Sequence, residues 1–171
     1  TNSALKSVTN KENSVLAEII TNEKVETINS EKLILAIGII ANTEKLGLKD
    51  FNVKIDKGHI VTNEFLETDE KGVYAIGDIT DGPWLAHKAS HEGILCVEKI
   101  AGHQNLKPID KTSIPGCTYC RPQVASIGMT ETQARSKNLN LKIGKFPFIG
   151  NGKAIALGDS EGCLLYTSPS P

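Results

Sequence analysis

The sequence lacks a long hydrophobic run and an excess of charge of one sign. Its longest apolar stretch, residues 33–41, is far shorter than the roughly 20 residues that a helix needs to cross a bilayer. The 19 basic and 20 acidic residues are interspersed and give a formal net charge of -1. A membrane span, a nucleic-acid surface and a polybasic membrane patch are therefore not expected. With 39% hydrophobic residues, the chain should be a soluble globular protein that binds small molecules or proteins.

The first half of the chain predicts strands, turns and one helix. Runs rich in Val and Ile predict strands at "SVLAEII", "KVETIN" and "EKLILAIGII", and the last is apolar enough to be buried on both faces. "DKGHIV" predicts a tight turn before a strand over residues 59–62. "VYAI", residues 73–76, predicts a buried strand, and a helix should run from about Leu85 to Ala101 and stop at Gly102. The small and apolar residues Ala86, Ala89, Gly93, Ile94, Val97 and Ile100 recur along it at helical spacing.

The composition changes after a linker over residues 108–115, which predicts the start of a second domain. Thr130 and Gln133 have the spacing of a capping box, so a short helix should begin there. "LKIGKFPFIG" and "KAIALG" are expected to be strands, with a phosphate-binding glycine loop as the weaker interpretation because no helix start is expected after it. The Ser- and Pro-rich end, residues 163–171, is expected to be a disordered, non-native tail.

"AIGDIT" suggests a ligand site at the end of the predicted strand. A glycine lets the backbone approach a ligand closely, and the carboxylate of Asp78 can accept hydrogen bonds from hydroxyl groups. The following helix would direct its free N–H groups and positive dipole end to the same place. A flavin has both a chain of hydroxyls and a ring that becomes anionic on reduction, so it suits this pattern, although a Gly-Asp pair alone is usually an ordinary turn.

Three segments together closely resemble the dihydrolipoyl dehydrogenase family of flavoproteins, in a form familiar from alphaproteobacteria. They are "GVYAIGDITDGPWLAHKASHEGILCVEKIAG", "IPGCTYCRPQVASIGMTETQA" and "KFPFIGNGKAIALG". The "LAHKA" segment with the "HEG" after it distinguishes this family from glutathione and mercuric reductases, which share only "YAIGD". The resemblance implies an α/β fold, namely a fragment of a flavoprotein with two dinucleotide-binding domains and a truncated α+β dimerisation domain.

The resemblance also implies the cofactor residues. Asp78 matches the aspartate that holds the ribityl chain of FAD, and residues 84–87 match the segment whose backbone meets the flavin ring. These four are Trp84, Leu85, Ala86 and His87. Gly38 matches the glycine at the edge of the NAD site, although Ile39, Ile40 and Ala41 stand where the family usually has two arginines and a proline. Trp84 stands where the family more often has methionine, a change that a main-chain contact should tolerate.

Several elements of the family's chemistry do not occur in this sequence. It has no C-x4-C redox pair, no G-x-G-x-x-G fingerprint, and no His-Pro with a partner glutamate. No catalytic residue is therefore expected here, and the chain, which begins at Thr1, is expected to be an internal piece of a longer protein. The expected parts are residues 1–42 as the end of the NAD domain, 43–111 as the C-terminal segment of the FAD domain, and 112–162 as the start of the dimerisation domain.

The implied activity is FAD-dependent oxidation of protein-bound dihydrolipoamide with NAD as the acceptor, in a cytoplasmic homodimer that meets the lipoyl domains of 2-oxo acid dehydrogenase acyltransferases. The chain alone should be inactive. The alternatives are another FAD-dependent disulfide oxidoreductase and a catalytically dead binding remnant.

Cysteine and histidine spacings offer competing interpretations. Cys117 and Cys120 have the spacing of a thioredoxin-type pair or half a zinc site, with Cys163 as a third ligand, but buried cysteines that act as small apolar groups are the simpler expectation. Cys96, on the helix, should belong to the core. His87 and His91 have a metal-clamp spacing without a third ligand nearby, and a pair of Lys88 with Glu92 should be a surface pair.

Overall fold

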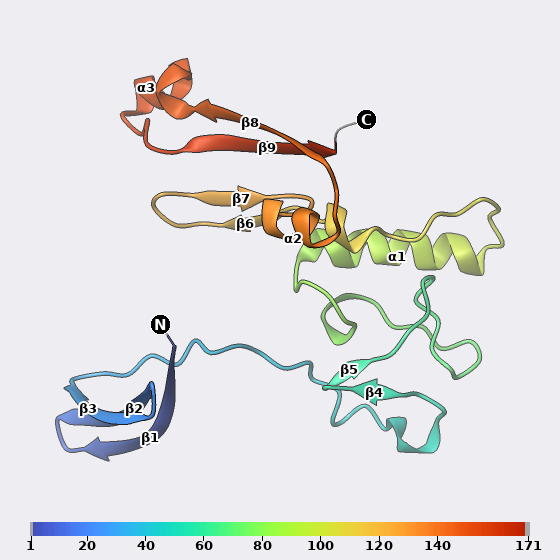
Figure 1. Ribbon diagram of the computed structural model, residues 1–171. Helices are drawn as coiled ribbons and strands as arrows, with labels where there is room; N and C mark the ends of the chain where they lie inside the picture. The colour runs from blue at the N-terminus through green and yellow to red at the C-terminus, as the bar shows by residue number, and fades with distance from the viewer. Residues whose placement is uncertain (1, 170–171) are drawn as a thin grey trace. The chain divides into compact units, whose positions relative to one another are not determined.

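The computed structural model describes residues 2–169 and divides into two compact units between Ile39 and Ile40 (Figure 1). The first unit is a three-stranded antiparallel sheet in the order β1-β2-β3. Its strands are β1 (Ser3–Lys11), β2 (Ser14–Thr21) and β3 (Lys24–Ser30). The strands predicted at "SVLAEII" and "KVETIN" are confirmed as β2 and β3, whereas β1 was not predicted.

The strand predicted over residues 31–40 is wrong. This segment is irregular and exposed, and Ile34 and Ile37 are 88% and 87% exposed. A strand buried on both faces needs a neighbouring strand and a layer on each face. Among residues 2–169, no strand pairs with this segment, so its apolar side chains have nothing to pack against.

The second unit begins with a small hairpin and short helical turns. The hairpin consists of β4 (Ile55–Asp56) and β5 (His59–Ile60). Lys57 and Gly58 both have positive φ angles, of 47° and 85°, so the predicted turn is confirmed, but the strand is shorter than expected. The 3-10 helices of the described residues are η1 (Leu48–Asp50), η2 (Gly77–Ile79), η3 (Lys111–Ser113) and η4 (Phe148–Gly150).

Helix α1 (Ala86–Ile100) confirms the predicted helix and its stop signal. Gly102 adopts a left-handed conformation with φ of 79°. Its N–H donates to the carbonyl of Lys99 at 3.1 Å, while the N–H of His103 donates to that of Glu98 at 3.0 Å. This pair of bonds is a Schellman motif, which satisfies the last carbonyls of the helix.

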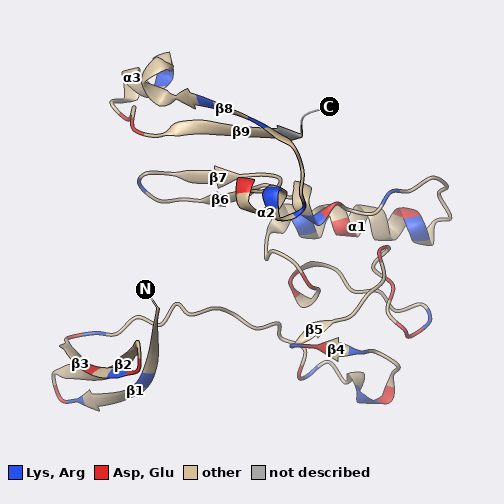
Figure 2. Ribbon diagram, viewed as in Figure 1, with Lys and Arg blue, Asp and Glu red and all other residues tan. Residues whose placement is uncertain are grey.

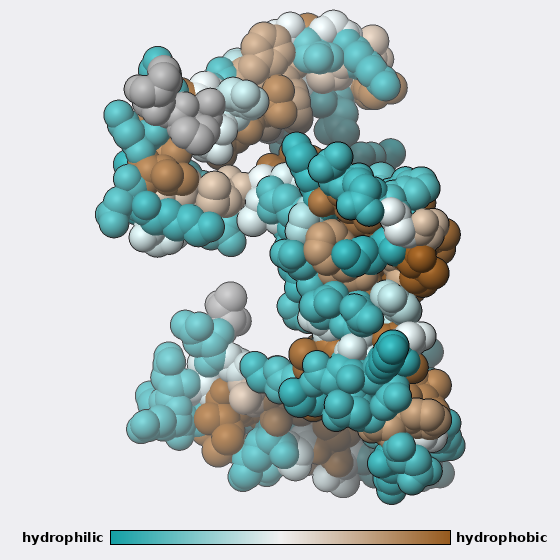
Figure 3. All heavy atoms as spheres, turned by 90° about the vertical axis from the view of Figure 1, so that its right-hand side faces the viewer, coloured by the Kyte–Doolittle hydropathy of each residue, from teal (hydrophilic) through white to brown (hydrophobic). Residues whose placement is uncertain are grey.

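The apolar residues that recur at helical spacing do not form the buried face of α1. Ile94, Val97 and Ile100 are each more than half exposed. The buried residues of the helix are instead Lys88, Glu92, Leu95 and Cys96. Apolar side chains are visible among polar ones on the surface in Figure 3, in keeping with the exposed Ile and Val residues of this chain.

The region after the linker begins with a hairpin and a capped helix. Strands β6 (Gly116–Thr118) and β7 (Val124–Ser126) pair in antiparallel fashion, and α2 (Glu131–Ser136) follows. The predicted capping box is confirmed, because the Thr130 hydroxyl accepts from the Gln133 N–H while the Gln133 side chain accepts from the Thr130 N–H.

Two expectations for the end of the chain are wrong. "KAIALG" is helix α3 (Gly152–Leu157), which begins where the Asn151 side chain accepts from the N–H groups of Lys153 and Ala154. A helix start therefore does follow the glycine run. The tail expected to be disordered forms β9 (Cys163–Pro169), which pairs antiparallel with the predicted strand β8 (Leu141–Pro147). The last two residues of that tail, Ser170 and Pro171, lie outside the described residues. No helix of residues 2–169 is long and apolar enough to cross a membrane.

Candidate functional site

The segment that leads into the predicted ligand site is not the buried strand that its sequence suggests. Tyr74 makes only an isolated antiparallel bridge to Glu67, and Ile76 is 39% exposed. The chain then enters η2, in which Gly77 has a φ of 75°. This left-handed conformation favours glycine, so the sharp bend at Gly77 explains the residue that the sequence places there.

Asp78 lies within η2 and is exposed. Its carboxylate makes no hydrogen bond or ion pair with any other residue of the described range 2–169. The turn itself is closed by a bond from the Thr80 N–H to the Gly77 carbonyl at 3.0 Å. The carboxylate is therefore free to accept hydrogen bonds from a hydroxylated ligand.

Two side chains of α1 hold the backbone of this turn. Glu92 Oε2 accepts the Gly77 N–H at 2.7 Å, and Lys88 Nζ donates to the Gly77 carbonyl at 3.0 Å. Lys88 Nζ also donates to the hydroxyl of Thr80 at 2.9 Å. The turn is thus fixed to the helix through both polar groups of one glycine.

The prediction that Lys88 and Glu92 form a surface pair is wrong. Their ion pair is 3.1 Å long, and their side chains are only 1% and 6% exposed. The sequence signal was present but misread, because Lys88 and Glu92 share a helix face with the buried Leu95 and Cys96. This buried contact between α1 and the turn is the feature of the candidate site that sequence reasoning missed.

The start of α1 presents free backbone donors. Leu85 is the N-cap residue and makes no side-chain cap bond, and the first turn contains no acidic residue. Just before it, the ring of Trp84 packs edge-on against His59 with centroids 6.1 Å apart. At the helix start, His87 Nε2 donates to the Pro115 carbonyl at 2.9 Å, which ties the helix to the linker.

Five of the predicted cofactor residues belong to one unit of the structure and the sixth belongs to the other. Asp78 in η2 and Trp84, Leu85, Ala86 and His87 at the start of α1 belong to one unit, in which α1 packs on η2. Gly38 belongs to the other unit, where it is exposed and has a φ of 128°. An added Cβ at Gly38 would meet no atom within 4 Å.

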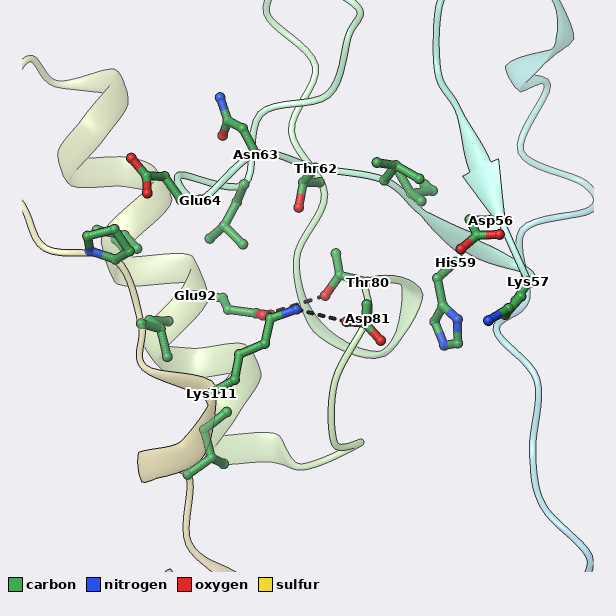
Figure 4. A pocket seen from close by; sticks show the side chains of 17 residues that line it. Asp56, Lys57, His59, Thr62, Asn63, Glu64, Thr80, Asp81, Glu92 and Lys111 are labelled. Carbon is green, nitrogen blue, oxygen red and sulfur yellow. Dashed lines mark hydrogen bonds and ion pairs between the residues drawn. The ribbon is translucent and has the colours of Figure 1, made fainter. Parts of the chain in front are cut away.

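A cleft of about 690 Å³, lined by both polar and apolar side chains, lies beside the turn (Figure 4). It is lined by the β4–β5 hairpin, the segment after it, Thr80, Asp81, the buried face of α1 and the linker. None of the six predicted cofactor residues is among the described residues that line it. In Figure 4, Lys111 reaches from the linker to Asp81, and their ion pair is 2.9 Å long.

The Lys111 ammonium lowers the pKa of Asp81 from its usual 3.8, mainly through its hydrogen bond to the carboxylate and to a smaller extent through its charge. Because this folded-state pKa is depressed, the contribution of the pair to stability is present above the usual pKa and is lost as the pH falls through the folded value.

Replacing Lys111 with methionine should raise the pKa of Asp81 towards its usual value, measured by NMR titration of its carboxyl carbon. Lys107→Met, just before the linker, is the control, and an unchanged Asp81 titration in Lys111→Met would contradict this assignment.

The cysteines and histidines do not gather into a metal site within residues 2–169, where no group of three His, Cys, Asp or Glu side chains could hold an ion. Cys96 is buried, as predicted. Cys117, Cys120 and Cys163 are exposed, so the expectation that the cysteines after the linker are buried is wrong. Cys120 points back into its own loop, because its thiol donates to the Pro122 carbonyl at 3.0 Å.

The donor set at η2 and α1 fits part of a flavin site. An exposed carboxylate can accept from ribityl hydroxyls, and uncapped N–H groups at a helix start favour a ring that gains negative charge. The Asp78 carboxylate and the N–H groups at the start of α1 belong to the same unit. These groups suit a hydroxylated, anionic ligand better than they suit a metal ion.

The chain belongs to the pyridine nucleotide-disulphide oxidoreductase family, which residues 1–93 match, while residues 114–165 match the family's dimerisation domain. Within that family it is similar to dihydrolipoyl dehydrogenases, as the sequence motifs predicted. It is 48% identical to that of Rhizobium etli over 88% of this chain and 32% of that protein. It is also 48% identical to that of Zymomonas mobilis over 95% of this chain and 35% of that protein. The chain thus spans about a third of the length of these relatives.

Solved structures confirm the predicted fold class. LpdA of Mycobacterium tuberculosis matches 99% of this chain with a TM-score of 0.87 and 22% identity. The HOCl-induced flavoprotein disulfide reductase RclA of Escherichia coli matches 97% with a TM-score of 0.81 and 20% identity. This chain covers 36% and 38% of those two structures, so it has the fold of a part of each.

Proposed function

We propose that this chain forms part of the FAD and NAD cradle of a dihydrolipoyl dehydrogenase. The observation that carries the proposal is the exposed carboxylate of Asp78, which has no partner within residues 2–169 and lies on a turn fixed to α1. When bound, FAD supplies the redox chemistry that links a dithiol to NAD. The activity of the whole enzyme would be oxidation of protein-bound dihydrolipoamide with NAD as the acceptor.

The residues of this chain bind and orient the cofactors in this proposal, and none of them is catalytic. Asp78 accepts hydrogen bonds from the ribityl hydroxyls, and the backbone of residues 84–87 faces the flavin ring. Gly38 borders the NAD site, with Ile39 and Ile40 beside it in place of cations. The sequence holds no C-x4-C pair and no G-x-G-x-x-G fingerprint, so the redox disulfide and the phosphate cradles must come from elsewhere.

The proposal extends to the assembly. The match of residues 114–165 to a dimerisation domain supports a homodimer. Lipoyl domains of a 2-oxo acid dehydrogenase acyltransferase would be the protein substrate, and the cytoplasm the compartment, as the similarity to bacterial dihydrolipoyl dehydrogenases implies.

A hybrid enzyme tests this function. This chain would replace the matching segment of the Rhizobium etli dihydrolipoyl dehydrogenase. We expect a yellow protein that reduces NAD with dihydrolipoamide, whereas the 171-residue chain alone should be colourless and inactive. A hybrid with a native circular-dichroism spectrum but no flavin absorbance would overturn the proposal, as would flavin bound tightly by the chain alone.

A further inference from the structure

We propose that Lys88 and Glu92 are positioning residues for the cofactor site, because from the buried face of α1 they set the direction of Asp78. This inference rests on the proposed function, in which Asp78 is the carboxylate that binds the flavin. Neither side chain is proposed to touch the cofactor. They act through the two peptide groups on either side of the Gly77 α-carbon.

The contacts fix the orientation of the two peptide groups that flank Gly77. Glu92 accepts the Gly77 N–H, which belongs to the peptide before Gly77, and Lys88 donates to the Gly77 carbonyl, which belongs to the peptide after it. Gly77 has the least restricted backbone of any residue type, and its φ of 75° is one of several conformations open to it. Holding both peptides selects one conformation and therefore one direction for the next side chain, Asp78.

Thr80 completes the clamp from the other end of the turn. It is 2% exposed, and its hydroxyl donates to the Gly77 carbonyl at 2.8 Å while it accepts from Lys88 at 2.9 Å. The packing is close, since an added Cβ at Gly82 would lie 3.0 Å from Cε of Lys88. The stem of Lys88 therefore has little freedom to move the ammonium away from the turn.

Stability alone does not account for burying this pair. A buried ion pair can often be replaced by apolar side chains of similar volume without loss of stability. The same chain contains an exposed pair of the same spacing, Glu131–Arg135, whose side chains are 39% and 62% exposed. The pair on α1 differs because its members hold the backbone beside an exposed carboxylate, which is a geometric role.

Amide exchange in the 171-residue chain tests the clamp without any cofactor. Glu92→Leu removes the acceptor of the Gly77 N–H, so this amide should exchange at least about ten-fold faster by NMR. Glu92→Gln keeps an amide oxygen that can accept and should stay within about three-fold of the unsubstituted chain. Arg135→Leu, in the exposed pair, is the matched control. Equal Gly77 exchange rates in Glu92→Leu and the unsubstituted chain would overturn the clamp.

Flavin affinity in the hybrid enzyme tests the positioning role. Glu92→Leu should weaken FAD binding at least about ten-fold, and Glu92→Gln should restore most of it. Asp78→Ala should then reduce FAD affinity less in the Glu92→Leu background than in the unsubstituted hybrid, because a misdirected carboxylate contributes less to binding. An equal cost of Asp78→Ala in both backgrounds would overturn positioning and leave only a structural role.

Two further results separate the possible failures. If Glu92→Leu does not fold, Thr80→Val removes the hydroxyl links of the turn with little change in volume, and the same coupling with Asp78→Ala is expected and decides the case. If the unsubstituted hybrid does not bind FAD, the proposed function fails, and Gly77 exchange still judges the clamp itself.

Discussion

Replacing Lys88 with methionine should lower the free energy of unfolding of the 171-residue chain by about 3–5 kcal/mol, among the largest effects of a single substitution in this protein. The Lys88 and Glu92 side chains are 1% and 6% exposed. Without the ammonium, the Glu92 carboxylate would remain buried against the Gly77 N–H with no cation to balance its charge. The expected loss is therefore mainly the cost of an uncompensated buried charge.

Urea denaturation followed by circular dichroism measures this loss, and two variants make it specific. Arg135→Met breaks the exposed pair with Glu131 and should change the unfolding free energy by no more than about 0.5 kcal/mol. The double variant Lys88→Met with Glu92→Leu removes both charges and should be more stable than Lys88→Met alone. A Lys88→Met protein within about 1 kcal/mol of the unsubstituted chain would show that this pair is not buried in solution.

Replacing Asp78 with alanine in the hybrid enzyme should weaken FAD binding by about 100-fold, a loss of about 3 kcal/mol. The reason is that an ionised carboxylate accepting from two hydroxyls makes charge-assisted hydrogen bonds, each stronger than a neutral one. In the free chain the same side chain is exposed and has no partner within residues 2–169. The substitution should therefore leave the unfolding free energy of the 171-residue chain nearly unchanged.

Fluorescence titration of the apo hybrid with FAD provides the measurement. Asp81→Ala is the matched control, because Asp81 is an exposed aspartate three positions later whose partner is Lys111. Asp78→Asn should lie between the two, since an amide oxygen still accepts hydrogen bonds without the charge. Equal FAD affinities of the Asp78→Ala and Asp81→Ala hybrids would remove Asp78 from the proposed site.

Local signals in the sequence predicted the elements that local chemistry determines. Thr130 and Gln133 predicted the capping box of α2, and Gly102 predicted the end of α1, because each motif is completed within one turn of helix. Lys57 and Gly58 predicted the β4–β5 turn for the same reason. These motifs need no information from distant parts of the chain.

The elements that were mispredicted depend on what surrounds them. Residues 31–40 have the composition of a buried strand, but nothing in residues 2–169 pairs with them. "KAIALG" contains a short apolar run that fits a strand, yet Ala and Leu favour helix, and the cap at Asn151 together with the left-handed Gly158 decides in favour of α3. A six-residue apolar pattern fits either structure, so the flanking residues carry the information.

The candidate site shows the same division. Short motifs predict Asp78 and the start of α1 as cofactor residues, whereas the spacing of Lys88 and Glu92 predicts a surface pair and gives no sign of the buried clamp. Charged residues are rarely buried unless paired, and i,i+4 pairs are most often exposed, so that interpretation followed the general rule. In Figure 2, the Lys, Arg, Asp and Glu residues of α1 are drawn by charge alone, and only their burial and contacts distinguish this pair from the others.

The short distance along the chain between the Gly77 turn and its clamp has a consequence for the order of folding. The bonds that hold Gly77 come from positions 11 and 15 residues later in the chain. Closing so small a loop costs little chain entropy, and contacts of low sequence separation form rapidly. We therefore expect the turn and α1 to fold as one early, cooperative unit, with the direction of Asp78 already set when residues further along the chain begin to pack.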